Sequence, residues 1–270
     1  MTAAAQVHEA KGHQRPDGPR RGRLFLVPAP LDFGCDPPAP LADFMPHGTL
    51  AVAARLNHWI CENAKSARAY LKRINAVQPL DHPVQQQLIV ELPHGVHKKG
   101  DHDGSFDARP LLQPALLGHD MGLLSEAGMP AVADPGSSVV RAAHDLGLAV
   151  VPLVGPVSLL LALAASGLNG QNFAFVGYMP QDPTQRSQRI RTLESVALNT
   201  GQTQLIIETP YRNTVLLQAL LQTLQPGTRL AVGVGLTLAG ARCHSYSVKN
   251  WRQQPPALDN ATPAVFALGR

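Results

Sequence analysis

The sequence has no apolar run of the roughly 18 residues that a helix needs to cross a bilayer. The stretch Leu148–Leu168 comes nearest, but Pro152 and the pair Gly155-Pro156 interrupt it. The first residues also lack the apolar core of a secretory signal. We therefore expect no membrane partner and a cytoplasmic location.

Cysteine is scarce, with Cys35, Cys61 and Cys243 as the three in 270 residues. No two of them form a C-x-x-C pair, which argues against a disulfide framework and a zinc knuckle and favours reduced thiols. Three histidines lie in the polar, glycine-broken segment 94–104, but their spacing fits no compact zinc pattern. We expect a mobile loop beside the substrate there, and no metal site.

Several common catalytic motifs are missing. There is no G-x-S-x-G and no G-x4-G-K-[ST], so a serine hydrolase or P-loop function has no anchor. The segment Gly233–Gly240 superficially resembles a dinucleotide loop, yet neither a helical pattern nor a ribose-binding acid follows it. We interpret it as a turn. A nicotinamide-dependent oxidoreductase would rest on fold analogy alone.

Positive charge is concentrated at the N-terminus. The formal net charge is +4, and residues 1–23 carry five Lys and Arg against two acids, which leaves the remainder at +1. We expect residues 1–21 to form a disordered arm. A basic arm that touches RNA is the alternative. The nearly neutral remainder gives little support for a nucleic-acid partner.

The chain is organised around residues 121–168. Met121–Leu124 is predicted to be a buried strand that ends in a Gly/Pro turn. Apolar residues at helical spacing follow between Asp134 and Leu146. Leu148–Leu153 is β-branched and predicts a second buried strand, ending beside the first. Leu159–Ala165 is an uncharged helix, which we expect at the heart of its domain. Turns of this kind leave backbone N–H groups free to hold a polar ligand.

The remaining pattern alternates between strands and helices, which predicts an α/β fold. We place the domain boundary at the polar hinge after Leu168, giving an N-terminal domain (22–168) with a largely parallel sheet and a C-terminal domain (173–270) with a mixed sheet. The further predicted strands are Arg23–Val27, Thr49–Ala54, Gln87–Leu92, Phe173–Gly177, Gln204–Glu208, Arg229–Val234, His244–Val248 and Pro263–Leu268. The further predicted helices are Cys61–Arg73, Leu111–Leu117, Thr184–Val196 and Tyr211–Leu224.

Four motifs carry a resemblance to a known family. They are GRLFLVPAP (22–30), SEAGMP with ADPG (125–136), VPLVGPVS (151–158) and IETPYR (207–212). In this order they resemble the tetrapyrrole methylase superfamily of S-adenosylmethionine (SAM)-dependent methyltransferases. The branch that methylates the ribose 2′-oxygen of small-subunit ribosomal RNA, with its uncharacterised relatives, is the most similar.

The resemblance implies a two-domain fold with SAM in the cleft between a parallel and a mixed sheet, in a homodimer. It also implies a set of residues on the SAM side: Pro28, Ser125, Gly128, Asp134, Gly155 and Ser158. The RNA branch carries Asp-Thr-Arg where this chain has Asn63-Ala64-Lys65. It also carries charged residues where this chain has Val234, Gly235 and Leu238. The methyl acceptor is therefore unidentified, with RNA as one candidate, and a non-catalytic SAM-binding module stays the alternative.

Three residues are candidates for the substrate side. Glu208 ends an apolar strand, where a carboxylate is costly unless it is paired or functional. Arg212 lies one helical turn further on, so a structural Glu–Arg pair is the other interpretation. Glu126 follows a strand end in the expected crevice. Asp134 precedes Pro135-Gly136 and is also a candidate cap for the next helix.

Overall fold

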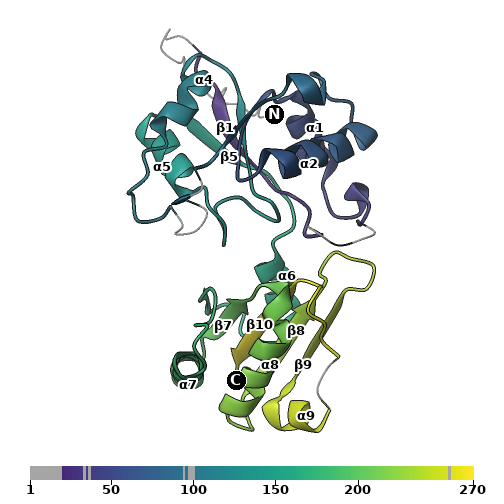
Figure 1. The fold of residues 1–270 in the computed structure, drawn as a ribbon, viewed down its shortest axis with the longest axis vertical. Coiled ribbons are helices and arrows are strands. Elements are labelled where there is room, and N and C mark those ends of the chain that lie inside the picture. Colours follow the sequence, from purple (N-terminus) through teal and green to yellow (C-terminus); the bar gives the residue numbers. More distant parts are fainter. Residues whose placement is uncertain (1–19, 33–34, 36–37, 94, 97–100, 255–256) are drawn as a thin grey trace, which may run out of the picture.

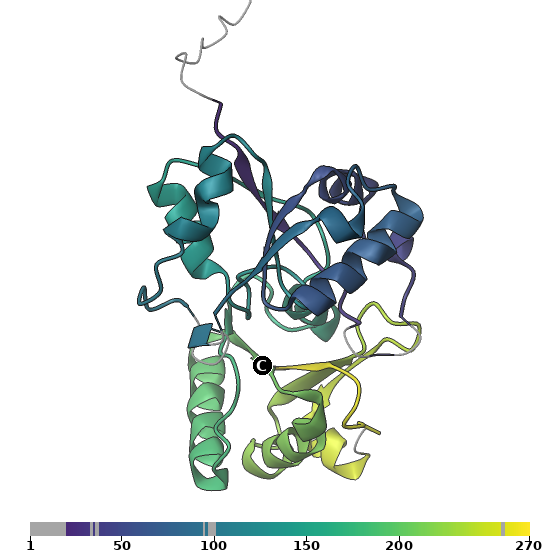
Figure 2. The same cartoon turned by 45° about the horizontal axis from the view of Figure 1, so that its top comes forward.

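The computed structural model describes residues 20–32, 35, 38–93, 95–96, 101–254 and 257–270. They form two lobes, each built on a five-stranded sheet (Figures 1 and 2). Most of the predicted arm lies outside these residues, as do His94 and His97 of the predicted loop. Among the described residues, no helix combines the length and apolar composition that a membrane crossing requires.

The sheet of the first lobe is entirely parallel, in the order β3-β2-β4-β1-β5. Its strands are β1 Arg23–Val27, β2 His58–Cys61, β3 Leu88–Glu91, β4 Met121–Leu124 and β5 Ala149–Pro152. Side chains alternate across the sheet, so Phe25 and Val27 enter one core while Leu24 enters another. Burial on both faces is the usual arrangement of a parallel sheet.

Helices cover both faces of this sheet (Figure 1). The first core is closed by η1 Leu41–Asp43, α1 His47–Arg55, α2 Ala64–Val77 and η2 Val84–Gln86. The second is closed by η3 Arg109–Leu112, α4 Gln113–Leu116 and α5 Ser137–Asp145. The predicted helices at 111–117 and after Asp134 are thus confirmed.

Two predictions for this lobe are wrong. Residues 49–54, predicted as a strand, lie within α1, and the strand comes later as β2. Leu50, Ala53 and Ala54 are buried on one face of that helix, a pattern that a short apolar run disguises. The strands β4 and β5 do not end side by side, because β1 lies between them and β5 is an edge strand.

The second lobe has a mixed sheet in the order β6-β7-β10-β8-β9. Only the β6–β7 pair is parallel. The strands are β6 Phe173–Phe175, β7 Thr203–Ile207, β8 Arg229–Val234, β9 Arg242–Ser247 and β10 Ala264–Gly269. One face is covered by α7 Pro183–Thr200, α8 Asn213–Thr223 after the turn η4 Pro210–Arg212, and α9 Val248–Gln253. The predicted mixed sheet is confirmed, whereas α9 was not predicted.

The uncharged helix α6 (Ser158–Ser166) covers the opposite face of the second sheet. Leu159 and Leu163 pack against Leu205 and Ala231 of that sheet. The predicted boundary at residues 168–173 placed this helix in the first domain, but its apolar partners lie in the second lobe. We therefore propose that the boundary falls between Pro152 and Ser158.

Candidate functional site

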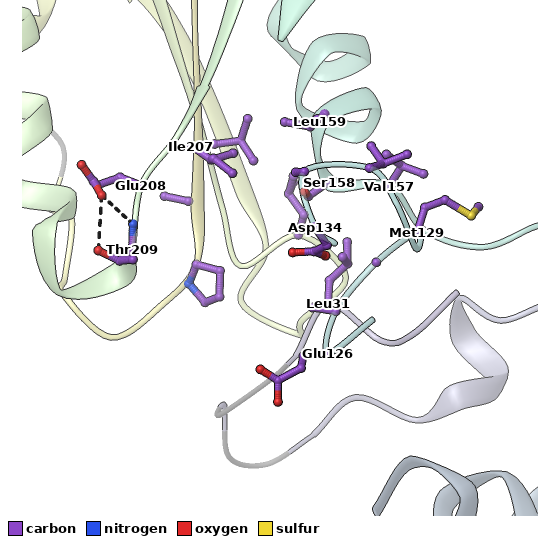
Figure 3. Close-up of a pocket in the computed structure, with 18 of the residues that line it drawn as sticks. Leu31, Glu126, Met129, Asp134, Val157, Ser158, Leu159, Ile207, Glu208 and Thr209 are labelled. Atoms are coloured by element: carbon purple, nitrogen blue, oxygen red, sulfur yellow. Dashed lines mark hydrogen bonds between the residues drawn. The ribbon is translucent and has the colours of Figure 1, made fainter. Parts of the chain in front are cut away.

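A cavity of about 320 Å³ lies between the lobes. The first lobe supplies the loops that follow β2, β4 and β5, and the second lobe supplies the ends of β7 and β8 and the segment after β6. The apolar part of its wall includes Leu159, Ile207, Leu236 and Val265. Figure 3 shows Glu126 and Asp134 on one side and Glu208 on the other.

The structure brings together five of the nine predicted site residues. The lining contains Glu126, Gly128, Asp134, Ser158 and Glu208. It also contains Glu62 and Tyr178, which sequence reasoning missed. Glu62 directly follows β2, so recognising that strand would have placed an acid at the carboxyl edge of the sheet.

The four other predicted residues do not line this cavity. Pro28 and Gly155 pack together, and a Cβ on Gly155 would lie 2.3 Å from Pro28 Cγ. Their closeness holds the loops after β1 and β5 against each other. Ser125 lines a neighbouring cavity of about 260 Å³, and its Oγ has no hydrogen-bond partner in the described part of the chain. Arg212 contacts Glu208 and is not part of the cavity wall.

Glu208 forms the ion pair that the sequence left open. Arg212 Nη2 lies 3.2 Å from Glu208 Oε2, and Glu208 is only 7% exposed. The backbone N–H of Thr209 donates to Glu208 Oε1 at 2.9 Å (Figure 3). The carboxylate thus has a structural partner and still borders the cavity.

Asp134 does not cap α5, contrary to the capping role considered for it. The start of that helix is held by Asp101 instead. The Asp101 carboxylate accepts from the N–H groups of Gly136 at 2.9 Å and Ser138 at 2.8 Å, and from Ser137 Oγ at 2.7 Å. Asp134 is left with its side chain toward the cavity (Figure 3).

The loop that carries Asp134 has an unusual backbone. Ala131 and Ala133 have φ values of 61° and 65°, in the left-handed region that residues with a Cβ rarely occupy. Gly128 has φ 72°, and a Cβ there would lie 3.2 Å from Leu31 Cδ2. Gly128 and Ala29 also exchange backbone hydrogen bonds of 2.8 and 3.1 Å. The loop is therefore fixed at both ends, by this bridge and by the Asp101 cap.

Electrostatics single out Asp134 among the carboxylates. Burial raises the pKa of Asp134 to about 7, and the negative charges of Glu62 and Glu126 add to the shift. Burial also raises the pKa of Tyr178, and the negative charges of Asp134, Glu208 and Glu62 add to the shift. Tyr178 therefore keeps its proton at neutral pH and can donate a hydrogen bond.

The ends of β2 and β4 are tied together at the site. The N–H of Glu126 donates to Glu62 Oε1 at 3.3 Å, and Ser66 Oγ donates to Glu126 Oε1 at 2.7 Å. Asn63 caps α2 by accepting from the N–H groups of Lys65 and Ser66. Asn63, one of the departures from the RNA branch, therefore has a structural role.

The cavity fits SAM in size and chemistry. Its volume lies at the lower end of the range of about 300–1,000 Å³ that is typical of small-molecule sites. The apolar wall suits a purine ring, and the carboxylates suit a sulfonium, an ammonium and ribose hydroxyls. Within the described ranges, no group of three His, Cys, Asp or Glu is arranged to hold a metal ion.

Comparison with curated proteins finds relatives over part of the chain, whereas no protein-family model matches. Two relatives are each named ribosomal RNA small subunit methyltransferase I. The one from Mesorhizobium japonicum is 39% identical over 132 residues, which is 48% of this chain and 44% of that protein. The one from Vibrio cholerae is 34% identical over 124 residues, which is 46% of this chain and 42% of that protein. The matches thus span less than half the length of these relatives.

Comparison with solved structures confirms the fold. The methyltransferase CobJ matches with a TM-score of 0.55 at 17% identity, over 92% of this chain and 94% of that one. A uroporphyrin-III C-methyltransferase from Thermus thermophilus matches with a TM-score of 0.51 at 18% identity, over the same shares of the two chains. The chain therefore has the two-domain tetrapyrrole-methylase fold that its motifs predicted, and its similarity to the ribosomal RNA methyltransferases is confirmed.

Proposed function

We propose that this protein is a SAM-dependent methyltransferase that holds SAM in the cavity between its lobes. The observation that carries the proposal is the cavity itself, which is assembled from the predicted motif loops after β4, β5 and β7. The similarity to proteins named as methyltransferases supports it.

SAM supplies a methyl group that its positive sulfur already makes electrophilic. The chain must then hold the acceptor in line and receive its proton. We assign SAM contacts to Gly128, Asp134 and Ser158, and the positioning of loops around SAM to Pro28, Ser125 and Gly155. Substrate-side roles go to Glu126 and to the Glu208–Arg212 pair.

The ribose 2′-oxygen of ribosomal RNA is one candidate acceptor, by similarity to the named relatives. The cavity favours a smaller or less anionic acceptor, because none of its described lining residues is Lys, Arg or His. Phosphate-rich partners usually meet basic side chains. A non-catalytic SAM-binding module is the second candidate function. It is favoured by Val234, Gly235 and Leu238, which replace charged residues of the RNA branch at the end of β8 and in the turn that follows it, beside the cavity.

Calorimetry with SAM, S-adenosylhomocysteine and NAD tests the proposal. We expect SAM and S-adenosylhomocysteine to bind at micromolar concentrations and NAD not to bind. Absence of SAM binding at millimolar concentration would overturn the proposed function. Mass spectrometry of ribosomal RNA and small metabolites, from cells with and without the protein, then separates enzyme from binding module. A methylated species that disappears with the protein identifies the acceptor.

We also propose a homodimer, as the resemblance implies. Leu160 and Leu161 of the uncharged helix α6 are both exposed, which supports an apolar contact surface. Light scattering at tens of micromolar should give twice the 28.8 kDa of the chain. A monomeric mass at that concentration would contradict the proposal.

A further inference from the structure

Asp134 is the carboxylate of the cavity that lacks a partner. Glu208 has Arg212, and Glu126 has the hydroxyl of Ser66. Asp134 makes no hydrogen bond or ion pair with any other residue that the structure describes, because Asp101 has taken over the helix cap. Asp134 is half-buried, and its oxygens are not among the fully buried side-chain atoms without a hydrogen-bond partner, so its carboxylate is open to a ligand in the cavity that it lines.

The backbone keeps this carboxylate where it is. The left-handed residues Ala131 and Ala133 precede it, and Gly136 follows it with φ 134°. Strained conformations of this kind persist where the surrounding structure fixes them, and they concentrate at ligand sites. The bridge at Gly128 and the Asp101 cap therefore fix the backbone that places Asp134 in the wall of the cavity.

The groups that face Asp134 make a negative charge there unfavourable. Glu62 and Glu126 approach from the ends of β2 and β4, while Glu208 and Tyr178 lie across the cavity in the second lobe. No described cation lines the cavity to offset them. A ligand that brings positive charge would reverse this balance and favour the ionised form.

We propose that Asp134 supplies the negative charge that balances the sulfonium of bound SAM and then receives the proton that leaves the methyl acceptor. The proposal rests on the proposed function, since it needs SAM in this cavity. Asp134 gains the proton of a hydroxyl or amine as that group's lone pair bonds to the methyl carbon and the carbon–sulfur electron pair stays on sulfur. The carboxylate and the sulfur lose their charges together, so the net charge of the cavity does not change. Asp134 later returns its proton to solvent.

The proposal predicts that SAM and S-adenosylhomocysteine differ in proton release on binding. The full chain is titrated with each ligand at pH 7, in two buffers of different ionisation enthalpy. In the ligand-free protein the pKa of Asp134 is about 7, so this carboxyl is protonated in about half of the molecules at pH 7. Binding of SAM should therefore release about half a proton per site from Asp134. S-adenosylhomocysteine, whose sulfur is neutral, should release none from this group.

Asp134→Asn should abolish the difference in proton release between SAM and S-adenosylhomocysteine. Proton release from the amino groups of the ligands should be the same in the variant and in the unmodified chain. Asp145→Asn is the matched control, because this exposed aspartate lies at the far end of α5, outside the cavity. It should behave as the unmodified chain does. In the unmodified chain, the extra proton release with SAM should also vanish at pH 9, where Asp134 is already ionised. If Asp134→Asn does not fold, this comparison of pH 7 with pH 9 tests the proposal instead.

Equal proton release for the two ligands in the unmodified chain would overturn the proposal. A difference that persists unchanged in Asp134→Asn would overturn it as well. Failure of either ligand to bind at millimolar concentration is a separate result, because it would remove the proposed function itself.

Discussion

Glu208 and Asp134 border the same cavity with different surroundings. Glu208 is buried, forms an ion pair with Arg212 and accepts a hydrogen bond from the backbone N–H of Thr209. Asp134 instead faces the negative charges of Glu62 and Glu126. Opposite charge stabilises an ionised carboxylate, and like charge destabilises it. The pair at Glu208 is therefore suited to hold an acceptor in place, and Asp134 is suited to change its protonation.

We expect Glu208→Gln to reduce methyl transfer by roughly 100-fold, the scale of a misplaced reactant. The glutamine keeps the shape but removes the charge, so SAM affinity should barely change. The unfolding temperature should fall by a few degrees, since Arg212 loses its counter-charge. Single-turnover rates and a thermal melt measure both effects. Normal turnover by the folded variant would make Glu208 purely structural.

Asp134 should make the ligand-free protein less stable as pH rises. Its pKa is about 7 when folded against a model value of 3.8, so between these values the native state binds more protons than the unfolded state. Stability then falls as pH rises through that window. We expect Asp134→Asn to be more stable than the unmodified chain at pH 8, by about 1–3 kcal/mol after allowance for partial exposure, and little different at pH 4.

Chemical denaturation at the two pH values measures this effect. The two proteins should unfold at the same denaturant concentration at pH 4 and separate at pH 8. A variant that is less stable at pH 8 would mean that the ionised carboxylate already has a stabilising partner without ligand.

Among the elements, local pattern decided what could be predicted. Met121–Leu124 and Arg229–Val234 are bounded by turn residues and were predicted with little error as β4 and β8. Residues 49–54 were misassigned because a six-residue apolar run suits a strand and a helix equally well. The missing strand β2 then hid Glu62, which follows it.

Long-range partners explain the rest of what the sequence did not reveal. The cap of α5 comes from Asp101, 35 residues before Gly136, and no spacing rule connects them. Tyr178 enters the cavity from the second lobe only because the two lobes meet there. Gly128, Asp134 and Ser158 of the motifs line the cavity, since each lies in a segment that follows a strand of the first lobe. Pro28 and Gly155 instead shape neighbouring loops.

The cap on α5 can be tested by Asp101→Ala. Asp101 is 2% exposed, and its removal leaves the N–H groups of Gly136 and Ser138 without their acceptor. We expect the free energy of unfolding to fall by about 2 kcal/mol. Asp103→Ala is the matched control, because its bonds reach only Ser105 on the surface, and its effect should stay within about 0.5 kcal/mol. Urea denaturation measures the free energy of unfolding of both variants. Equal losses of stability in Asp101→Ala and Asp103→Ala would contradict the capping role.

On the scale of the whole molecule, the positive charge at the N-terminus is partly engaged by the first lobe. Arg21 Nη1 donates to the carbonyl of Leu146 at 2.6 Å, and Arg23 pairs with Asp120 at 2.7 Å. The folded part of the chain therefore reaches at least to Arg21, a residue that the sequence analysis assigned to the arm. Of the other basic residues of the arm, Arg20 is described and exposed, whereas Lys11 and Arg15 lie outside the described part.

We expect deletion of residues 1–19 to leave the unfolding temperature and the SAM affinity unchanged. The deletion keeps Arg21 and Arg23, whose contacts secure the start of β1. Differential scanning calorimetry and a SAM titration on the shortened and full chains provide the comparison. A loss of many degrees would show that the arm stabilises the folded part.

The position of β10 has a consequence for how the chain acquires its structure during synthesis. All five strands of the first lobe precede residue 153, so that lobe can fold while the rest is still being made. The second lobe must wait, because β10 is the last strand in sequence yet lies between β7 and β8 in the centre of its sheet. Until residues 264–269 leave the ribosome, Leu159 and Leu163 of α6 have no completed sheet to cover. A nascent chain stalled before residue 264 should therefore be protease-resistant in its first half and cleaved in its second.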